Sequence, residues 1–312
     1  MSAVLSALIP VFLVIALGVF LKRTLLPSAE AWDSLERLIY FVLFPALLIT
    51  TTATADFRNV PAAGVGGALF TAILGVGLVL IALHSLIVRA LAINGPAYTS
   101  VFQGAMRWNT FVALSIAASL HGALGLALAS VAMVAMIPLL NVLCVIVLAW
   151  YAADKTPDAK SVLDQLVRNP LIWSVIVGLT LNLSGLPLPK VIISFGDILG
   201  RGALAVGLLV VGAGLELDQT LRPSAAVLTS VLIKLLLMPT VAIGIGLAMG
   251  LSGAALSVVA IASSMPTAPG AYVLARQMRG DAALIARIIS LETVAAVATI
   301  PLALAAAQWL AP

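Results

Sequence analysis

The chain has 312 residues, of which 62% are hydrophobic and only 9% are charged, and its formal net charge is +4. A soluble domain has about 45–50% apolar and about 25% charged residues, so this composition excludes an ordinary soluble protein and indicates a membrane protein. The positive charge does not indicate a nucleic-acid partner, because the basic residues separate by membrane side, as described below. The single cysteine, Cys144, excludes an internal disulfide.

Ten apolar segments follow one another along the chain, each close to the length of about 20 residues that crosses a bilayer. Their runs are too long and too continuous for the strands of a barrel, so we predict an all-α membrane protein. The first segment lacks a basic region before it and is interpreted as a retained span, not a secretory signal. The predicted spans cover residues 3–21, 37–54, 62–91, 97–119, 122–150, 171–187, 191–215, 224–250, 252–275 and 283–310.

The basic residues separate between the two sets of loops that ten alternating spans define. One set holds only Arg58 and Lys190. The other set holds Lys22, Arg23, Arg37, Arg89, Lys155, Lys160, Arg168, Arg222, Arg276, Arg279 and Arg287. Because cytoplasmic loops carry the excess of Lys and Arg, we expect a multi-pass protein of the cell (inner or plasma) membrane with both termini extracytoplasmic.

The longest polar stretch divides the spans into two sets of five. We assign residues 1–153 to a first five-helix repeat, 154–170 to a cytoplasmic connecting loop and 171–312 to a second repeat. An odd number of spans in each half forces the second half to insert upside down relative to the first. The sequence therefore predicts two inverted repeats.

The ninth segment is interrupted by the sequence SSMPTAPG at residues 263–270. Proline removes a helical hydrogen bond, and in lipid the freed groups persist only inside protein or beside a watery cavity. Such interruptions mark substrate sites in secondary transporters, where half-helix N-termini attract anions. A simple kink is the alternative, although two prolines and a glycine this close together exceed one. The predicted substrate-binding residues here are Pro266, Thr267, Ala268, Pro269 and Gly270.

The fourth segment carries Arg107, Asn109 and Thr110 near the middle of the bilayer. A central arginine costs at least about 2.5–3.5 kcal/mol on insertion scales, and it is tolerated where it faces a cavity or a partner. We predict that Arg107 is the counter-ion of an anionic substrate, and the alternatives are a structural ion pair or snorkelling. Asn109 is predicted to orient the substrate, with an interhelical hydrogen bond as the alternative. Thr110 is included in the predicted binding site.

Lys234 in the eighth span and Glu292 in the tenth reach a similar depth from the inner side. Two opposite charges at one depth suggest mutual compensation, as a proton-linked or gating pair or as a static ion pair. Asn141 in the fifth span is similarly deep and is expected to form a hydrogen bond between helices. These three residues are the candidates for coupling or gating.

No enzyme site is indicated by the sequence. It contains no Walker loop, no metal-spaced His/Cys cluster and no nucleophile elbow. We therefore expect neither an enzyme nor an ATP-driven pump, and no cofactor or metal site.

Several motifs resemble the auxin efflux carrier family, including its bacterial permease members, and they keep the family's order over nearly the whole chain. The most specific is SSMPTAPGAYVLARQMRGD at 263–281. The others are LIYFVLFPAL at 38–47, RWNT at 107–110, PLLNVL at 138–143, RNPLI at 168–172, the Gly212–Gly214 region at 208–217 and Lys234 to Pro239.

This resemblance implies a fold shared with bile-acid transporters and sodium/proton antiporters, in which broken helices 4 and 9 cross. It implies elevator-type alternating access against a scaffold of helices 1, 2, 6 and 7, and a homodimer is expected. Family substrates are small organic anions: auxin in plants and dicarboxylates such as malonate for bacterial members. Many members have Gly and Pro after the fourth-helix Asn, but residues 111–115 contain neither, so that break is expected to be mild or carried by Gly104 and Asn109.

The sequence therefore predicts a secondary transporter of a small organic anion, with proton or sodium coupling possible in principle and a lipid bilayer as its surroundings. The first alternative is a cation/proton antiporter on the same fold, which requires a carboxylate at the crossing. The second is a membrane sensor that binds a ligand without moving it.

Overall fold

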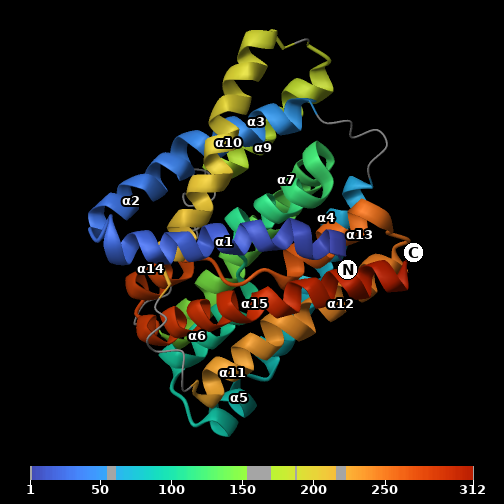
Figure 1. Ribbon diagram of the computed structural model, residues 1–312. Coiled ribbons are helices and arrows are strands. Elements are labelled where there is room, and N and C mark those ends of the chain that lie inside the picture. Colours follow the sequence, from blue (N-terminus) through green and yellow to red (C-terminus); the bar gives the residue numbers. More distant parts are fainter. Residues whose placement is uncertain (1, 55–60, 153–169, 187, 216–222, 312) are drawn as a thin grey trace.

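The computed structural model describes residues 2–54, 61–152, 170–186, 188–215 and 223–311, and these residues are helical with short connections and form no strand (Figure 1). The predicted all-α class is confirmed for this part of the chain. The helices are α1 (Ser2–Thr24), α2 (Ala29–Leu38), α3 (Phe44–Thr54), α4 (Ala62–Ala82), α5 (His84–Leu91), α6 (Gly95–Met106), α7 (Thr110–Tyr151), α9 (Pro170–Ser184), α10 (Lys190–Ala213), α11 (Ala225–Leu232), α12 (Met238–Ala248), α13 (Gly253–Ser264), α14 (Gly270–Gln277) and α15 (Ala282–Leu310), with π-helical turns at Ile39–Leu43 and Ile233–Leu237.

Seven helical segments of the described residues are long and apolar enough to cross a membrane, where the sequence predicts ten spans. The segment 95–151 contains two of the predicted spans, because the helix resumes directly after Gly122, whose φ of 56° and ψ of −136° are not helical. The predicted sixth and ninth spans correspond to apolar helices, 170–184 and 253–264, that are shorter than a full crossing.

The predicted boundary of the second span at residue 37 is wrong, because the helix begins at Ala29. Ser28 caps its first turn by accepting a hydrogen bond from the backbone N–H of Ala31 at 3.3 Å. Half of residues 29–36 are polar or charged, so they carry no hydropathy signal, yet α2 continues through the π-helical turn into α3 without a break. The predicted connecting loop, Arg58 and Arg222 lie outside the described residues, apart from residue 170 at the start of α9.

One group of helices consists of α1, α2, α3, α9 and α10, in which α10 packs against α1, α2 and α3, and α9 packs against α3; we call it the first helix group. α1 and α10 approach so closely that a Cβ atom on Gly18 would overlap the carbonyl oxygen of Leu209, and one on Gly212 would overlap that of Ile15. Small residues allow this contact between main chains, as is common between membrane helices. Figure 1 shows α9 and α10 beside α3, away from α6 and α11.

The second helix group consists of α4, α6, α7 and α11 to α15. Two short helices, α6 and α13, lie at its centre, and every residue from Ala97 to Met106 and from Ala255 to Ser264 is buried. Protein on all sides of these helices satisfies the condition under which helices can be interrupted at membrane depth.

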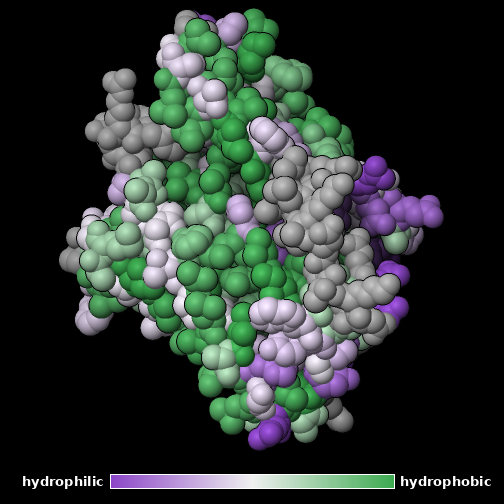
Figure 2. Space-filling view, turned by 180° about the vertical axis from the view of Figure 1, so that it is seen from behind, coloured by the Kyte–Doolittle hydropathy of each residue, from purple (hydrophilic) through white to green (hydrophobic). Residues whose placement is uncertain are grey.

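The outer surface is hydrophobic over wide areas, as expected for a protein in lipid. Leu183 is 76% exposed and Trp309 is 82% exposed, and Figure 2 shows hydrophobic residues over most of one face, with the most hydrophilic residues near its edges. In Figure 1, α1 begins and α15 ends at the same end of the bundle, opposite α14.

The close contact of α1 and α10 gives a first testable prediction. Gly212→Val places a side chain against the carbonyl of Ile15 and should lower the free energy of unfolding by about 1–3 kcal/mol, as overpacking does. Gly244→Ala is the matched control, because a Cβ atom there meets nothing within 4 Å, and it should leave stability equal or slightly higher. Thermal unfolding of the detergent-purified protein measures both, and equal stability of the two variants would contradict the packing argument.

Candidate functional site

The fourth segment is fully interrupted although it contains no proline. α6 ends at Met106 and α7 begins at Thr110, and Arg107 between them is extended, with φ −68° and ψ 155°. Asn109 supplies the cap of the new helix: its Oδ1 accepts hydrogen bonds from the N–H groups of Phe111 at 3.1 Å and Val112 at 3.2 Å. An Asn cap satisfies N–H groups that otherwise lack a partner, so the break is carried by Asn109, one of the two residues predicted for it.

The interruption predicted in the ninth segment is also present. α13 ends at Ser264 and α14 begins at Gly270. Met265 is extended, with φ −67° and ψ 139°. Pro266 and Pro269 both fall in the gap, where a missing N–H removes no helical hydrogen bond.

The two breaks contact each other through Thr267. This side chain is completely buried, and its hydroxyl donates to the carbonyl oxygen of Gly104 at 2.7 Å, with the carbonyl oxygen of Arg107 as a second, weaker acceptor at 3.3 Å. The last carbonyls of α6 have no partner within their own helix, and the hydroxyl from the other break satisfies them. The predicted meeting of the two interruptions is therefore observed as a direct hydrogen bond between them.

Lys234 and Glu292 are both completely buried, and each contacts one of the breaks. Lys234, in the π-helical turn between α11 and α12, donates from Nζ to the carbonyl of Met106 at 3.5 Å. Glu292 of α15 accepts at Oε2 from the backbone N–H of Thr267, at 2.8 Å. The two charges lie close enough to interact electrostatically, but their hydrogen bonds go to the breaks and no direct ion pair joins them.

These positions match the polarity of the interrupted helices. A cation is favourable at the C-terminal end of a helix and an anion near an N-terminal end. Lys234 stands at the last carbonyl of α6, and Glu292 stands at an N–H just before α14. The equal depth of the two residues suggested that their charges compensate each other. In the structure each charge instead forms a hydrogen bond with the main chain at one of the breaks.

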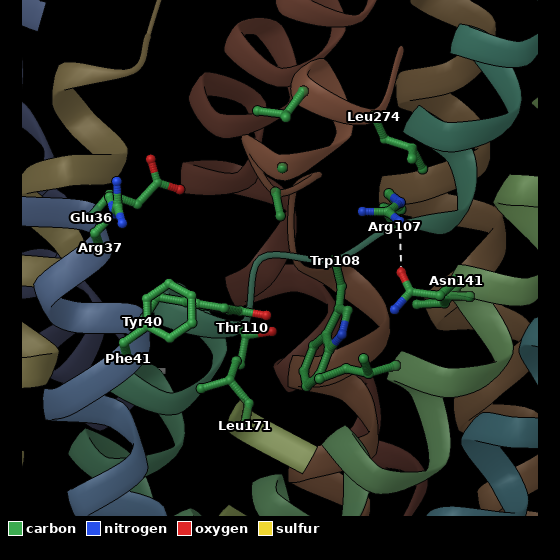
Figure 3. Close-up of a pocket in the computed structure, with 15 residues that line it drawn as sticks. Glu36, Arg37, Tyr40, Phe41, Arg107, Trp108, Thr110, Asn141, Leu171 and Leu274 are labelled. Atoms are coloured by element: carbon green, nitrogen blue, oxygen red, sulfur yellow. Dashed lines mark hydrogen bonds between the residues drawn. The ribbon is translucent and has the colours of Figure 1, made fainter. Parts of the chain in front are cut away.

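A pocket of about 470 Å³ lies beside the fourth-segment break, between the two helix groups. It is lined by Glu36, Arg37, Tyr40, Phe41, Arg107, Trp108, Thr110, Ile137, Leu140, Asn141, Leu171, Ala268, Gly270, Val273 and Leu274. Figure 3 shows Arg37 and Tyr40 on one side of this pocket and Arg107 with Asn141 on the other.

The predicted site residues divide between the pocket wall and the layer behind it. Arg107, Thr110, Asn141, Ala268 and Gly270 line the pocket. The remaining predicted residues do not line it but form or support the breaks: Asn109, Pro266, Thr267, Pro269, Lys234 and Glu292.

The wall opposite Arg107 was not predicted. Glu36, Arg37, Tyr40 and Phe41 come from α2 and the π-helical turn that follows it. A signal for them existed, because Tyr40 and Phe41 belong to the 38–47 motif and Arg37 follows an acidic residue at the start of an apolar run. Trp108, between Arg107 and Asn109, was also missed.

The guanidinium of Arg107 is held by an amide and not by an acid. Its Nη2 donates to Asn141 Oδ1 at 2.7 Å (Figure 3), and its Nε has no hydrogen-bond partner within the described part of the chain. No ion pair to Arg107 is formed among the described residues, so the structural ion pair that was one alternative is not observed there.

Two further donors beside Arg107 have no partner among the described residues. They are Nε1 of Trp108, whose side chain is 4% exposed, and Nδ2 of Asn109, which is 1% exposed. The amide of Asn109 is not free to flip, because its oxygen is fixed by the cap on α7. Gln103, in the last turn of α6, has both its amide nitrogen and its amide oxygen unpartnered. The break is thus surrounded mainly by hydrogen-bond donors.

Comparison with known proteins relates part of this chain to membrane transport proteins. Residues 156–304 match the model of a family described as "Membrane transport protein". The resemblance to a family of membrane transporters is confirmed. The chain is also 32% identical over 148 residues to an "Uncharacterized transporter" of Methanothermobacter thermautotrophicus, a match covering 46% of this chain and 48% of the relative. The similarity therefore extends over about half of either protein, and it supports a membrane transporter.

The contact between the breaks gives a second prediction. Thr267→Val keeps the shape of the side chain but leaves the carbonyls of Gly104 and Arg107 without the hydroxyl. It should lower the free energy of unfolding by about 1–3 kcal/mol, the cost of unsatisfied buried groups. Thr267→Ser, which keeps the hydroxyl, is the matched control. If thermal unfolding places the Val variant level with the Ser variant, the hydrogen bond does not hold the breaks together.

Proposed function

We propose that the protein is a secondary carrier for a small organic anion, such as a mono- or dicarboxylate or an auxin-like acid, bound in the pocket beside the two breaks. The observation that carries this proposal is the set of unpartnered donors around Arg107. Buried donors without acceptors are costly, and a carboxylate, which only accepts hydrogen bonds when ionised, supplies what they lack.

The balance of donors and acceptors favours an anion over a cation. Arg107 and Trp108 line the pocket and carry unpartnered N–H groups, and the side-chain acceptor of Arg107, Asn141 Oδ1, is already occupied by the guanidinium. Arg and carboxylate form charge-assisted hydrogen bonds that are about twice as strong as neutral ones. The N–H groups of Arg107 that do not bind Asn141 are the proposed binding position for the substrate carboxylate.

The opposite wall suggests the rest of the substrate. Tyr40, Phe41 and Trp108 give an apolar surface, while Arg37 offers a second cation beside Glu36. A pocket of about 470 Å³ lies within the range of about 300–1,000 Å³ that is usual for small-molecule sites. Both a monocarboxylate with an apolar body and a short dicarboxylate fit this chemistry, the second with its other carboxylate at Arg37.

The proposed topology retains ten spans in two inverted five-helix repeats, 1–153 and 171–312. The seven long segments become eight when 95–151 is divided at Gly122, and α9 and the interrupted pair α13 and α14 complete the ten. In this topology the pocket lies on the cytoplasmic side of the breaks, because Arg37, Leu171 and Leu274 all lie toward the loops rich in Lys and Arg. In this topology the conformation is inward-facing, and both termini lie outside.

An elevator-type movement is consistent with where the pocket lies. Its walls come from both helix groups: Tyr40 and Leu171 from the first, Arg107, Asn141 and Leu274 from the second. If the second group moves against the first, the substrate travels with Arg107 and leaves the wall of Tyr40. The first group would be the scaffold, and a homodimer through it remains an expectation from the family.

One observation favours the alternative of a cation/proton antiporter. The sequence places no carboxylate within the breaks, yet Glu292 reaches the ninth-segment break from α15. Both its oxygens already accept hydrogen bonds, from Thr267 N–H and from Ser230 Oγ at 3.3 Å, so we rank this alternative below the anion carrier. A ligand sensor differs from a carrier only in turnover, which counterflow of labelled substrate detects.

The counter-ion role of Arg107 gives the third prediction. In proteoliposomes, Arg107→Ala should reduce uptake of radiolabelled malonate or indole-3-acetate at least about tenfold, because a charge-assisted hydrogen bond is lost. Arg89→Ala is the control, since Arg89 is exposed at the end of α5. A variant that stays folded, as judged by its thermal unfolding, and retains full uptake of the transported acid would reject the role.

The partner of the guanidinium gives a fourth prediction. Asn141→Asp places a fixed carboxylate on Arg107 and should abolish anion uptake while leaving the protein at least as stable, because it imitates the substrate. Asn141→Ala releases Nη2 without adding a charge and should retain substantial uptake. Comparable uptake by the Asp and Ala variants would contradict the proposed competition.

A further inference from the structure

Ser230 of α11 stands between two hydrogen-bond acceptors. Its Oγ lies 3.3 Å from the carbonyl oxygen of Val101 in α6 and 3.3 Å from Oε1 of Glu292 in α15. A hydroxyl has one hydrogen and can donate to only one of them at a time, while its lone pairs can accept another bond. Ser230 is completely buried, and a Cβ atom on Gly104 would overlap its Oγ. The helices α6 and α11 are therefore in close contact at this point.

We propose that Glu292 and Ser230 form a proton-binding site whose two protonation states are both fully hydrogen-bonded. This inference rests on the proposed function as a carrier, whose coupling ion it identifies as a proton. When Glu292 is ionised, Oε1 accepts from Ser230 and Oε2 accepts from the N–H of Thr267. When a proton from solution binds at Oε1, that O–H donates to Ser230 Oγ, and the hydroxyl of Ser230 turns to donate to Val101.

The exchange between the two states needs only the rotation of one hydroxyl. One proton is gained at Oε1, no covalent bond between heavy atoms changes, and the bond from Thr267 to Oε2 persists in both states. A buried carboxylate with only one arrangement of donors would instead leave an unsatisfied group after protonation. The carbonyl of Val101 is the acceptor that makes the second arrangement possible.

The surroundings of Glu292 leave few other groups to titrate with it. Lys234 faces it from the π-helical turn, and Cys144 of α7 lies close enough to Lys234 to interact electrostatically. Arg107 joins the same network through its carbonyl oxygen, which accepts from the hydroxyl of Thr267. The packed helices α11, α12 and α13 contain no titratable side chain. The other titratable groups on α6, α14 and α15 are Tyr98, Tyr272, Arg276 and Arg287, and the hydrogen bonds of the Glu292 carboxylate go to Ser230 and Thr267 instead.

Infrared difference spectroscopy on the lipid-reconstituted protein tests this site without any transported anion. In a pH titration the protein should show the carbonyl band of a protonated, buried carboxyl group that disappears on raising the pH. Glu292→Gln should remove this band. Asp197→Asn, at an exposed position of α10, should leave it unchanged.

Ser230→Ala provides the discriminating measurement and is a small change in a buried position. Removing the hydroxyl takes a donor from the ionised carboxylate, whose hydrogen bonds are the stronger ones. The midpoint of the band should therefore move to higher pH by about one unit, a roughly tenfold change in proton affinity. Absence of a pH-dependent band in the wild type, or an unchanged midpoint in Ser230→Ala, would overturn the proposal.

Failure of the proton site and failure of the anion carrier give different experimental outcomes. A missing carboxyl band with normal Arg107-dependent uptake rejects the proton site and leaves the carrier intact. A titrating band in Glu292 with no uptake of any acid rejects the anion carrier, and it would turn attention to the antiporter alternative.

Discussion

Interrupted helices at membrane depth must satisfy their main-chain groups without water, and in this protein each break does so with help from the other. The hydroxyl of Thr267 binds the carbonyls of Gly104 and Arg107, Lys234 binds the carbonyl of Met106, and Glu292 binds the N–H of Thr267. Because unsatisfied groups in the membrane cost several kcal/mol each, these contacts make the two breaks a single unit. A displacement of one break carries the other with it.

This arrangement separates the groups that hold the breaks from the groups that face the pocket. Lys234 and Glu292 form hydrogen bonds with main-chain atoms behind the pocket wall, whereas the guanidinium of Arg107 donates a hydrogen bond to the neutral amide of Asn141. A guanidinium neutralised by a fixed acid would have no remaining preference for an anion. Arg107 and Trp108, which line the pocket, therefore keep unpartnered N–H groups, while Lys234 and Glu292 satisfy main-chain groups of the breaks.

The sequence predicts those features that depend on local chemistry. The ninth-segment break is predicted by Pro266, Pro269 and Gly270, because proline disrupts the helical hydrogen bonds wherever it occurs inside a helix. The break at Arg107 was expected to be mild or carried by Gly104 and Asn109, because residues 111–115 contain neither Gly nor Pro. Its cause is the cap formed by Asn109, and an Asn in an apolar segment fits a hydrogen bond between helices equally well.

Features that depend on tertiary contacts were harder to predict from the sequence. The equal depth of Lys234 and Glu292 is readable from span positions, but whether they contact each other or the breaks depends on side-chain directions. The pocket wall of Arg37 and Tyr40 required knowing that α2 lies against the fourth-segment break. Hydropathy also did not reveal the first turns of α2, because polar and charged residues are mixed with apolar ones there.

The buried charges also constrain how a proton and an anion would move together. With Arg107 and Lys234 charged and Glu292 ionised, the empty site carries one net positive charge. Binding a monocarboxylate would cancel it, and binding a proton at Glu292 as well would restore it, so the loaded and empty sites would carry the same charge. Each ligand lowers the electrostatic cost of the other, and such coupling is reciprocal. Because moving a changed charge through a low-dielectric region is expensive, a site that keeps its charge constant can cross in both its empty and its doubly loaded forms, which is the condition for cotransport.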